Sequence, residues 1–481
     1  MAPMDHGKNG SDSLRPKART SVSRRAWLNE RNARIVVAGA LLIKLALVVW
    51  NAAAYNNKSY DYRLHSARVA SAGLHASSRA YNPPLYYMPA LPFVEDIHKG
   101  KLKEGHSTGE LIHLLRFTNI LYLTLFYLCW IYLIIPKLIP DWRGATAASL
   151  VLLSFPGFQK LGAMTHPDNA VVGLSALGLA VWLWFRKRPT RAGWRDWAAV
   201  GGFGFVIGLL GMTRPFAAAP VFVLSLAGVI ALARERGVLS WAFFSRAALF
   251  AIVAGTLSLS WPVYRWQQIG TFKAGYNESW VGKFRDYRDD LDRVHYFTSF
   301  YFADLLREPN LLNPAFGYDG EPKVTNNISN SFPTIAYSEF WGDQWLYFSS
   351  PKYRTEGKRW PKRVLFVVAL LMLPLLAMRF MGGVVATGRR LARGDPDADA
   401  DALMVVYFVL GLALYFYWLM GDALLPGANT PIKFIYNAHL VPVFVTIAFF
   451  KAIGPRQFNA WFAYAGLVFL AALPVATFWP F

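Results

Sequence analysis

The chain has 481 residues, of which 54% are hydrophobic and only 16% are charged. A soluble globular protein carries about 25% charged residues, so the composition excludes an ordinary soluble enzyme of this length. Its single cysteine excludes a disulfide framework and any metal cluster built on cysteine. The net charge of +21 is compatible with nucleic acid or with anionic lipid, and the position of the basic residues distinguishes the two.

The N-terminal region, residues 1–33, is predicted to be a basic cytosolic tail. The first 34 residues contain eight Lys or Arg and no apolar core. The apolar run that follows has no small-residue cleavage signature, so we interpret it as a retained membrane anchor. Lys44 lies inside this run, where a lysine is costly and usually faces a polar interior.

Residues 34–481 are predicted to form one all-α transmembrane domain. A hydrocarbon core about 30 Å thick needs roughly 20 apolar residues in a helix. About eleven segments meet this requirement, and short breaks allow ten to thirteen. They are 34–54, 116–136, 144–162, 169–185, 197–213, 215–233, 245–263, 363–381, 402–420, 436–451 and 459–478.

Charge places the long loops of this map outside the cytosol. With the N-terminus inside, the short cytosolic loops are strongly basic, as in the run from Arg186 to Arg195. The two long loops, 55–115 and 264–362, hold seven basic against five acidic residues and thirteen against twelve. This distribution follows the positive-inside rule, so anionic headgroups explain the charge and nucleic acid is not needed. We expect both loops to carry short amphipathic helices.

The first long loop supplies one group of candidate site residues. Asp61 follows the first helix closely, where a polar headgroup would meet the protein, and His65 lies four residues later, on the same face of any helix. Asn82 and Tyr86 flank a Pro-Pro pair that forbids helix locally. The alternative for Asp61 is that it is an ordinary loop acid exposed to solvent, with no role in chemistry.

A second acid is expected on the same side of the membrane. Asp168 follows His166 and Pro167 in the short outer loop between the third and fourth segments. Asp168 could cap the next helix through the backbone N–H groups of its first turn, or take part in chemistry. The two roles are compatible.

Cations at the outer surface form the third group. Arg214 ends the motif from Gly208 to Pro215, and it could bind a phosphate or snorkel to lipid headgroups. Lys433, Tyr436 and His439 lie at helical spacing before the tenth segment, where they suit an anionic headgroup or anchor the interface.

Four of these stretches, in this order and on this side of the membrane, resemble the GT-C superfamily of membrane glycosyltransferases. They are Asp61, the Pro-Pro-Leu-Tyr stretch ending at Tyr86, Asp168, and the motif from Gly208 to Pro215. The pattern is most similar to the bacterial branch that contains aminoarabinose transferases and protein O-mannosyltransferases. Many relatives show an Asp-Glu pair in the first loop, whereas Tyr62 follows Asp61 here.

The resemblance implies a GT-C-like catalytic domain that transfers a hexose or pentose. The donor would be a polyprenyl-phosphate sugar, and the acceptor a hydroxyl of a glycan, lipid or protein, with inversion. Asp61 and Asp168 would be the catalytic acids, with Asp61 as the base. Arg214, Lys433, Tyr436 and His439, together with His65, Asn82, Tyr86 and His166, would bind the donor phosphate or the substrates. Because Tyr62 and not an acid follows Asp61, a divalent-metal site built on a paired acid is possible but not indicated, and no cofactor is expected.

The same resemblance predicts a bacterial inner membrane protein with its active site facing the periplasm and a role in building envelope glycans. Two other classes fit a basic polytopic chain. A lipid or glycan transporter is the main alternative, although such proteins usually show inverted repeats, which this sequence lacks. A non-catalytic scaffold is the second alternative class. Acidic residues at the outer surface, such as Asp61 and Asp168, would have no purpose in a scaffold.

Overall fold

A computed structural model describes residues 29–54, 84–96, 101–186, 193–214, 241–270, 360–418 and 437–478, with a few isolated positions between them. In this part of the chain, seven helical segments are long and apolar enough to cross a membrane. The chain is therefore an integral membrane protein built from helices, as predicted. The predicted count of eleven segments is not confirmed, and the segment 215–233 falls almost entirely outside the described residues.

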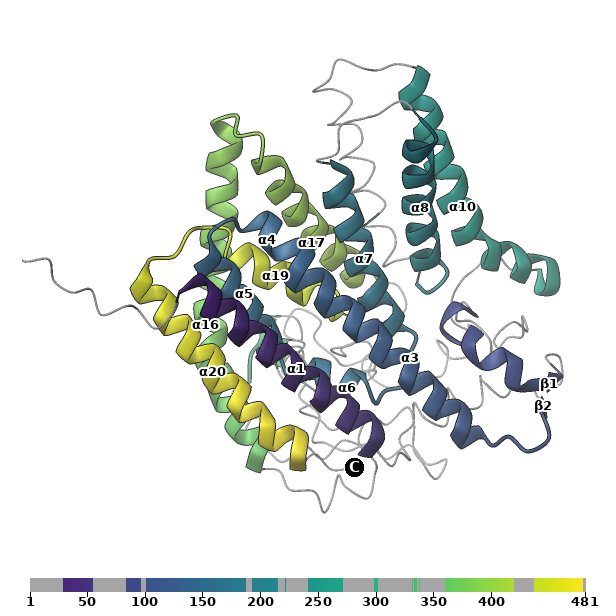
Figure 1. Cartoon of the computed structure of the whole chain (residues 1–481), viewed down its shortest axis with the longest axis horizontal. Helices are drawn as coiled ribbons and strands as arrows, with labels where there is room; N and C mark the ends of the chain where they lie inside the picture. Colours follow the sequence, from purple (N-terminus) through teal and green to yellow (C-terminus); the bar gives the residue numbers. More distant parts are fainter. Residues whose placement is uncertain are drawn as a thin grey trace, which may run out of the picture.

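The helices pack into one bundle (Figure 1). In chain order the described elements are α1 (Glu30–Ala54), η1 (Pro84–Tyr86), η2 (Met88–Phe93), β1 (Val94–Asp96), β2 (Lys101–Leu102), α3 (Thr108–Leu128), η3 (Cys129–Ile134), α4 (Ile135–Leu138), α5 (Trp142–Ser154), α6 (Gly157–Leu161), α7 (Asp168–Arg186), α8 (Trp194–Gly211), α10 (Trp241–Ile269), α16 (Trp360–Ala392), α17 (Ala398–Trp418), α19 (Val441–Ala448) and α20 (Pro455–Phe478).

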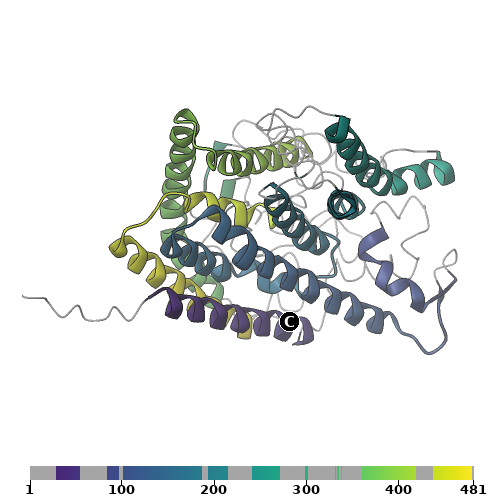
Figure 2. The same ribbon diagram turned by 45° about the horizontal axis from the view of Figure 1, so that its top comes forward.

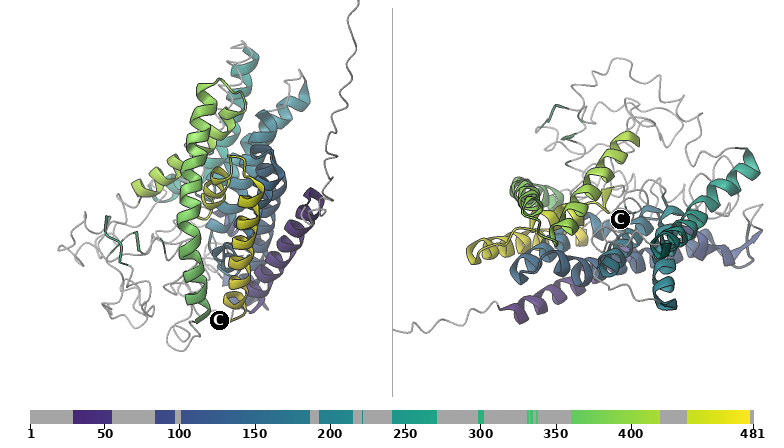
Figure 3. Two further views of the ribbon diagram at one scale, coloured as in Figure 1. Left: turned by 90° about the vertical axis from the view of Figure 1, so that its left-hand side faces the viewer. Right: turned by 90° about the horizontal axis from the view of Figure 1, so that it is seen from above.

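The centre of the bundle is formed by α5, α7 and α19, whose side chains are almost all buried. Outer helices turn large apolar side chains outward, among them Leu42 of α1, Ile252 of α10, Leu371 of α16 and Leu470 of α20. In a bilayer such side chains face lipid tails. Helix α16 is long and runs from one end of the bundle to the other, as the left view of Figure 3 shows.

The second predicted segment is a continuous but irregular helix. Helix α3 begins with a capping box, in which Ser107 and Glu110 satisfy each other's backbone N–H groups, so it starts eight residues earlier than predicted. It continues through the π-helical turn η3 into α4. Pro136 follows this turn at once, and a proline removes a helical hydrogen bond, so the wider turn accommodates it.

The third predicted segment, 144–162, is broken into α5 and α6 at Phe155 and Pro156. Proline cannot donate the hydrogen bond that would continue α5. The carbonyl group of Phe155 accepts a hydrogen bond from Lys44 Nζ at 2.6 Å, and Lys44 is fully buried. Lys44 therefore links α1 by a hydrogen bond to the break between α5 and α6.

Helices α8 and α10 pack together through glycine and lie beside α7 at one edge of the bundle (Figure 1). In Figure 2, α8 is seen nearly end-on between α7 and α10. A Cβ atom on Gly208 would lie 2.6 Å from Leu257 Cβ, and one on Gly211 would lie 2.1 Å from Ser258 Oγ. Only glycine allows this approach, which is a common way for membrane helices to associate.

The first outer loop differs in detail from the predicted amphipathic helices. Its described part consists of the 3₁₀ helices η1 and η2 and the antiparallel pair of strands β1 and β2. Pro84, Pro89 and Pro92 lie in or next to these short helices, and proline disfavours a regular α-helix. Helix η2 of this loop packs against α3.

Candidate functional site

The predicted residues Asp168 and Arg214 form a paired site. Arg214 Nε lies 3.0 Å from Asp168 Oδ1, and its Nη2 donates to Asp168 Oδ2 at 3.1 Å. This two-point geometry is the strongest form of a charge-assisted hydrogen bond. The Asp168 side chain is 2% exposed and the Arg214 side chain 15% exposed, so the cation is the member that reaches the surface.

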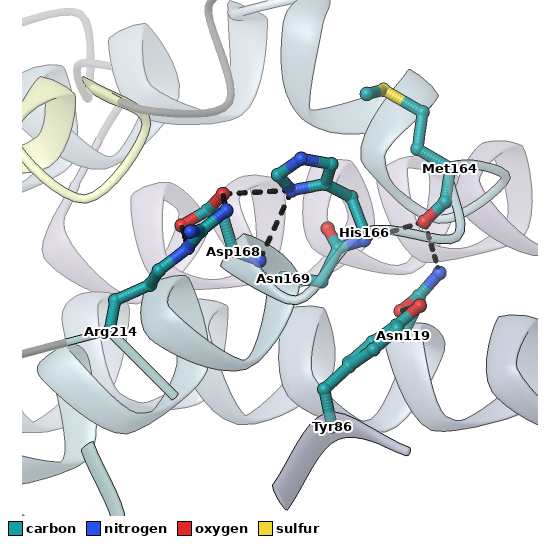
Figure 4. Close-up of polar contacts among 7 residues, drawn as sticks. All are labelled: Tyr86, Asn119, Met164, His166, Asp168, Asn169 and Arg214. Atoms are coloured by element: carbon teal, nitrogen blue, oxygen red, sulfur yellow. Dashed lines mark hydrogen bonds and ion pairs between the residues drawn. The ribbon is translucent and has the colours of Figure 1, made fainter. Parts of the chain in front are cut away.

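His166 is a third member of this site and contacts the Asp168 carboxylate, as Figure 4 shows. Its Nδ1 lies 2.8 Å from Asp168 Oδ2 and 3.3 Å from the backbone nitrogen of Asp168. The 3.3 Å contact would need Nδ1 to accept from the backbone N–H of Asp168, whereas a carboxylate can only accept, so the 2.8 Å contact needs the proton on Nδ1. One nitrogen cannot do both, and we assign the proton to Nδ1 on the shorter contact. The imidazole then orients Asp168, while its Nε2 points away from the carboxylate (Figure 4).

Local sequence explains why these residues are placed here. Asp168 is the first residue of α7, next to Pro167, which suits the start of a helix. Arg214 follows the last turn of α8, where its backbone N–H and the hydroxyl of Thr213 both donate to the carbonyl of Leu210. The contacts of the Asp168 carboxylate go to side chains, so its role extends beyond helix capping.

The loop that carries His166 is held by buried amides. The carbonyl of Met164 accepts from Asn119 Nδ2 at 2.6 Å, from Asn169 Nδ2 at 2.7 Å and from the backbone of His166 at 3.0 Å. Asn119 belongs to α3, and its Oδ1 accepts from the hydroxyl of Tyr86 at 3.0 Å. Figure 4 shows this chain of contacts leading from Tyr86 to the loop.

Two other predicted residues have different surroundings. Tyr86 is fully buried and faces Asn119, so it is a poor candidate for direct substrate contact. His439 is 5% exposed, and its ring lies edge-on to Tyr407 of α17, with ring centroids 6.4 Å apart. The remaining predicted site residues, Asp61, His65, Asn82, Lys433 and Tyr436, lie outside the described residues.

Three buried polar residues of α3 and α6 were not predicted from the sequence. They are Asn119, Arg116, which contacts the carbonyl of Ala52 in the last turn of α1, and Lys160. A polar residue inside an apolar run was the available signal. Within the described ranges, no group of three His, Cys, Asp or Glu residues could hold a metal ion.

This arrangement has the chemistry to bind an anion, on the side of the membrane that the sequence predicts to be the outer one. A guanidinium has five N–H donors, and the bridge to Asp168 fixes its plane and direction. A cation that is held in advance loses little freedom when an anionic ligand arrives.

No protein-family profile matches the chain, and no curated protein sequence matches it. Among solved structures it is similar to the archaeal oligosaccharyltransferase AglB from Archaeoglobus fulgidus, in complex with an inhibitory peptide and a dolichol-phosphate. The likeness covers 92% of this chain and 56% of that chain, at 12% identity and a TM-score of 0.41, so this chain spans little more than half that protein's length. A likeness this weak carries no argument about family or activity.

Proposed function

We propose that the chain is a membrane glycosyltransferase. It transfers a sugar from a polyprenyl-phosphate donor to a hydroxyl of a glycan, lipid or protein on the extracytoplasmic side, with inversion. The observation that carries this proposal is the pair at the expected outer ends of α7 and α8. Arg214 is held in two-point contact by the buried Asp168 and is the partly exposed member of the pair. The order of the four sequence stretches supports the same activity.

The proposed reaction uses the pair to stabilise the leaving group. The acceptor oxygen attacks the anomeric carbon of the donor, and the bond from that carbon to the phosphate oxygen breaks. Negative charge then grows on the polyprenyl phosphate, and Arg214 lowers the barrier by binding it. Asp61 takes the proton from the acceptor hydroxyl. Asp168 positions Arg214, since its carboxylate is engaged by Arg214 and His166.

Binding of a polyprenyl monophosphate to the purified full chain tests the phosphate site. The double variant Asp168→Asn/Arg214→Leu removes both charges and should weaken binding by about 1.5–3 kcal/mol, the range for hydrogen bonds to charged groups. Helix α8 offers a matched control at its other end. Arg246 pairs with Asp196 at 3.1 Å, with side chains 20% and 4% exposed.

The control variant Asp196→Asn/Arg246→Leu removes a similar ion pair from the predicted cytosolic side. It should leave phosphate affinity unchanged. Equal affinity in both double variants would remove Arg214 from the site. Turnover is the second measurement: purified protein should consume a polyprenyl-phosphate sugar, and Asp61→Asn should abolish this with little effect on phosphate binding. A transporter would bind the donor without consuming it.

A further inference from the structure

The hydrogen bonds of Tyr86 and Asn119 all lead to the loop between α6 and α7. Tyr86, Asn119 and Asn169 are each fully buried. The amide of Asn119 also lies 3.4 Å from the carbonyl of Gly162, so it contacts the loop at two points.

These contacts join three parts of the chain that are far apart in sequence. Tyr86 is the last residue of η1 in the first outer loop. Asn119 lies in the middle of α3, and the loop that both support comes directly before α7. Helix α3 lies against α7 so closely that a Cβ atom on Gly173 would be 2.8 Å from the carbonyl oxygen of Tyr122. The helix that carries Asn119 is therefore a fixed support for the loop.

We propose that Tyr86 and Asn119 are positioning residues for the phosphate-binding pair: they hold the loop 162–167 in the conformation that directs His166 and Asp168 toward Arg214. The inference rests on the function proposed above for that pair. It gives the Pro-Pro-Leu-Tyr stretch a role that acts through Asn119 rather than through contact with substrate.

The chemistry of the chain of contacts fits this role. Burial raises the pKa of the Tyr86 phenol well above its usual value, so the hydroxyl keeps its proton and remains a donor. Donation by Tyr86 fixes which end of the Asn119 amide carries oxygen, and the Nδ2 group must then face the loop. Without Asn119 the carbonyl of Met164 would keep two donors, Asn169 Nδ2 and the backbone N–H of His166, so what is lost is the hydrogen bond that ties the loop to α3.

The test compares Tyr86→Phe with Tyr127→Phe in the full chain. Tyr127 is also fully buried, but its hydroxyl has no hydrogen-bond partner among the described residues, so it is a matched control for loss of one oxygen. Tyr86→Phe should weaken binding of a polyprenyl monophosphate about two- to tenfold, the loss of one net hydrogen bond. Asn119→Leu removes the contacts to Tyr86, Gly162 and Met164 and should weaken binding at least as much. Tyr127→Phe should have no effect.

A double-mutant cycle separates positioning from general destabilisation. In the Asp168→Asn/Arg214→Leu background, Tyr86→Phe should cause no further loss of affinity, because the pair through which it acts is gone. A loss of the same size in both backgrounds would overturn the proposal.

Hydrogen exchange supplies a readout that does not need the ligand. Amides of residues 165–169 should exchange faster in Tyr86→Phe than in the parent or in Tyr127→Phe. If the parent protein fails to bind polyprenyl phosphate, the proposed function fails, and exchange alone decides whether Tyr86 holds the loop. Unchanged exchange in this segment would show that it does not.

Discussion

Asp168 and Arg214 share an ion pair but have unequal access to water. Asp168 is enclosed, whereas Arg214 lies at the end of α8 with part of its side chain exposed. An ionised group without a partner is costly in proportion to its burial. Loss of Arg214 therefore leaves a buried carboxylate, and loss of Asp168 leaves a guanidinium that can turn toward water.

This asymmetry predicts different losses of stability. Arg214→Ala should lower the free energy of unfolding by about 3–5 kcal/mol, the usual cost of breaking a buried pair, and Asp168→Asn by less. The double variant Asp168→Asn/Arg214→Leu should lose less than Arg214→Ala alone. Thermal unfolding in detergent measures all three. A larger loss for Asp168→Asn than for Arg214→Ala would show that Arg214 cannot reach solvent.

The sequence predicted Asp168, His166 and Arg214 as site residues on one side of the membrane, but not their direct contact. Asp168 and Arg214 are 46 residues apart, and only the packing of α7 on α8 brings them together. Asn119 was missed because an asparagine inside a predicted span gives no sign of which carbonyl it will meet. Tyr86 was found by its motif, but its burial could not be predicted.

At the scale of elements, the motif from Gly208 to Pro215 has two parts with separate purposes. Gly208 and Gly211 let α8 approach α10, and Thr213 and Arg214 close the helix and present the cation. Sequence reasoning treated the motif as one unit. In the structure its glycines serve packing, and its arginine forms the ion pair with Asp168.

Glycine-to-alanine changes on α8 test this division. Gly208→Ala should cost about 1–3 kcal/mol, because the new methyl group overlaps Leu257 Cβ close to the backbone. It should also weaken phosphate binding, since the end of α8 must shift. On the same helix, Gly202 has no atom within 4 Å of such a methyl group, so Gly202→Ala should be neutral or gain up to about 1 kcal/mol.

The measurements are thermal unfolding and titration with a polyprenyl monophosphate. Equal stability of the Gly208→Ala and Gly202→Ala proteins would contradict the close contact of α8 with α10. A stable Gly208→Ala protein with weakened phosphate binding would instead show that the helices adjust at the expense of the site.

At the scale of the whole molecule, hydropathy found most helices but not their breaks. Helices α1 and α20 were predicted within four residues at each end, whereas α16 continues to Ala392, eleven residues beyond its predicted end. The break at Pro156 was missed because the residues on both sides are apolar, although the proline itself was visible. Segment 436–451 contains the short helix α19, Val441–Ala448, with Pro442 in its first turn.

Sidedness remains a prediction, and the only native thiol makes it testable. Cys129 is buried, so the parent protein should resist a membrane-impermeant thiol reagent. Glu104 is exposed in the first outer loop and Arg393 between α16 and α17. Glu104→Cys should react only from the extracytoplasmic side and Arg393→Cys only from the cytosolic side. The reverse pattern would invert the map and the proposed site.

The glycines of α8 also bear on how the protein is made. Helix α8 is not among the seven segments that are apolar enough to cross a membrane, since its five glycines and charged first turn lower its hydropathy. It leaves the ribosome before α10, the helix that covers its glycine face. Because insertion of a nascent helix follows hydropathy, we expect α8 to settle in the bilayer only when α10 has been synthesised. Arg214 would then meet Asp168 late in biogenesis, although Asp168 is translated before either helix.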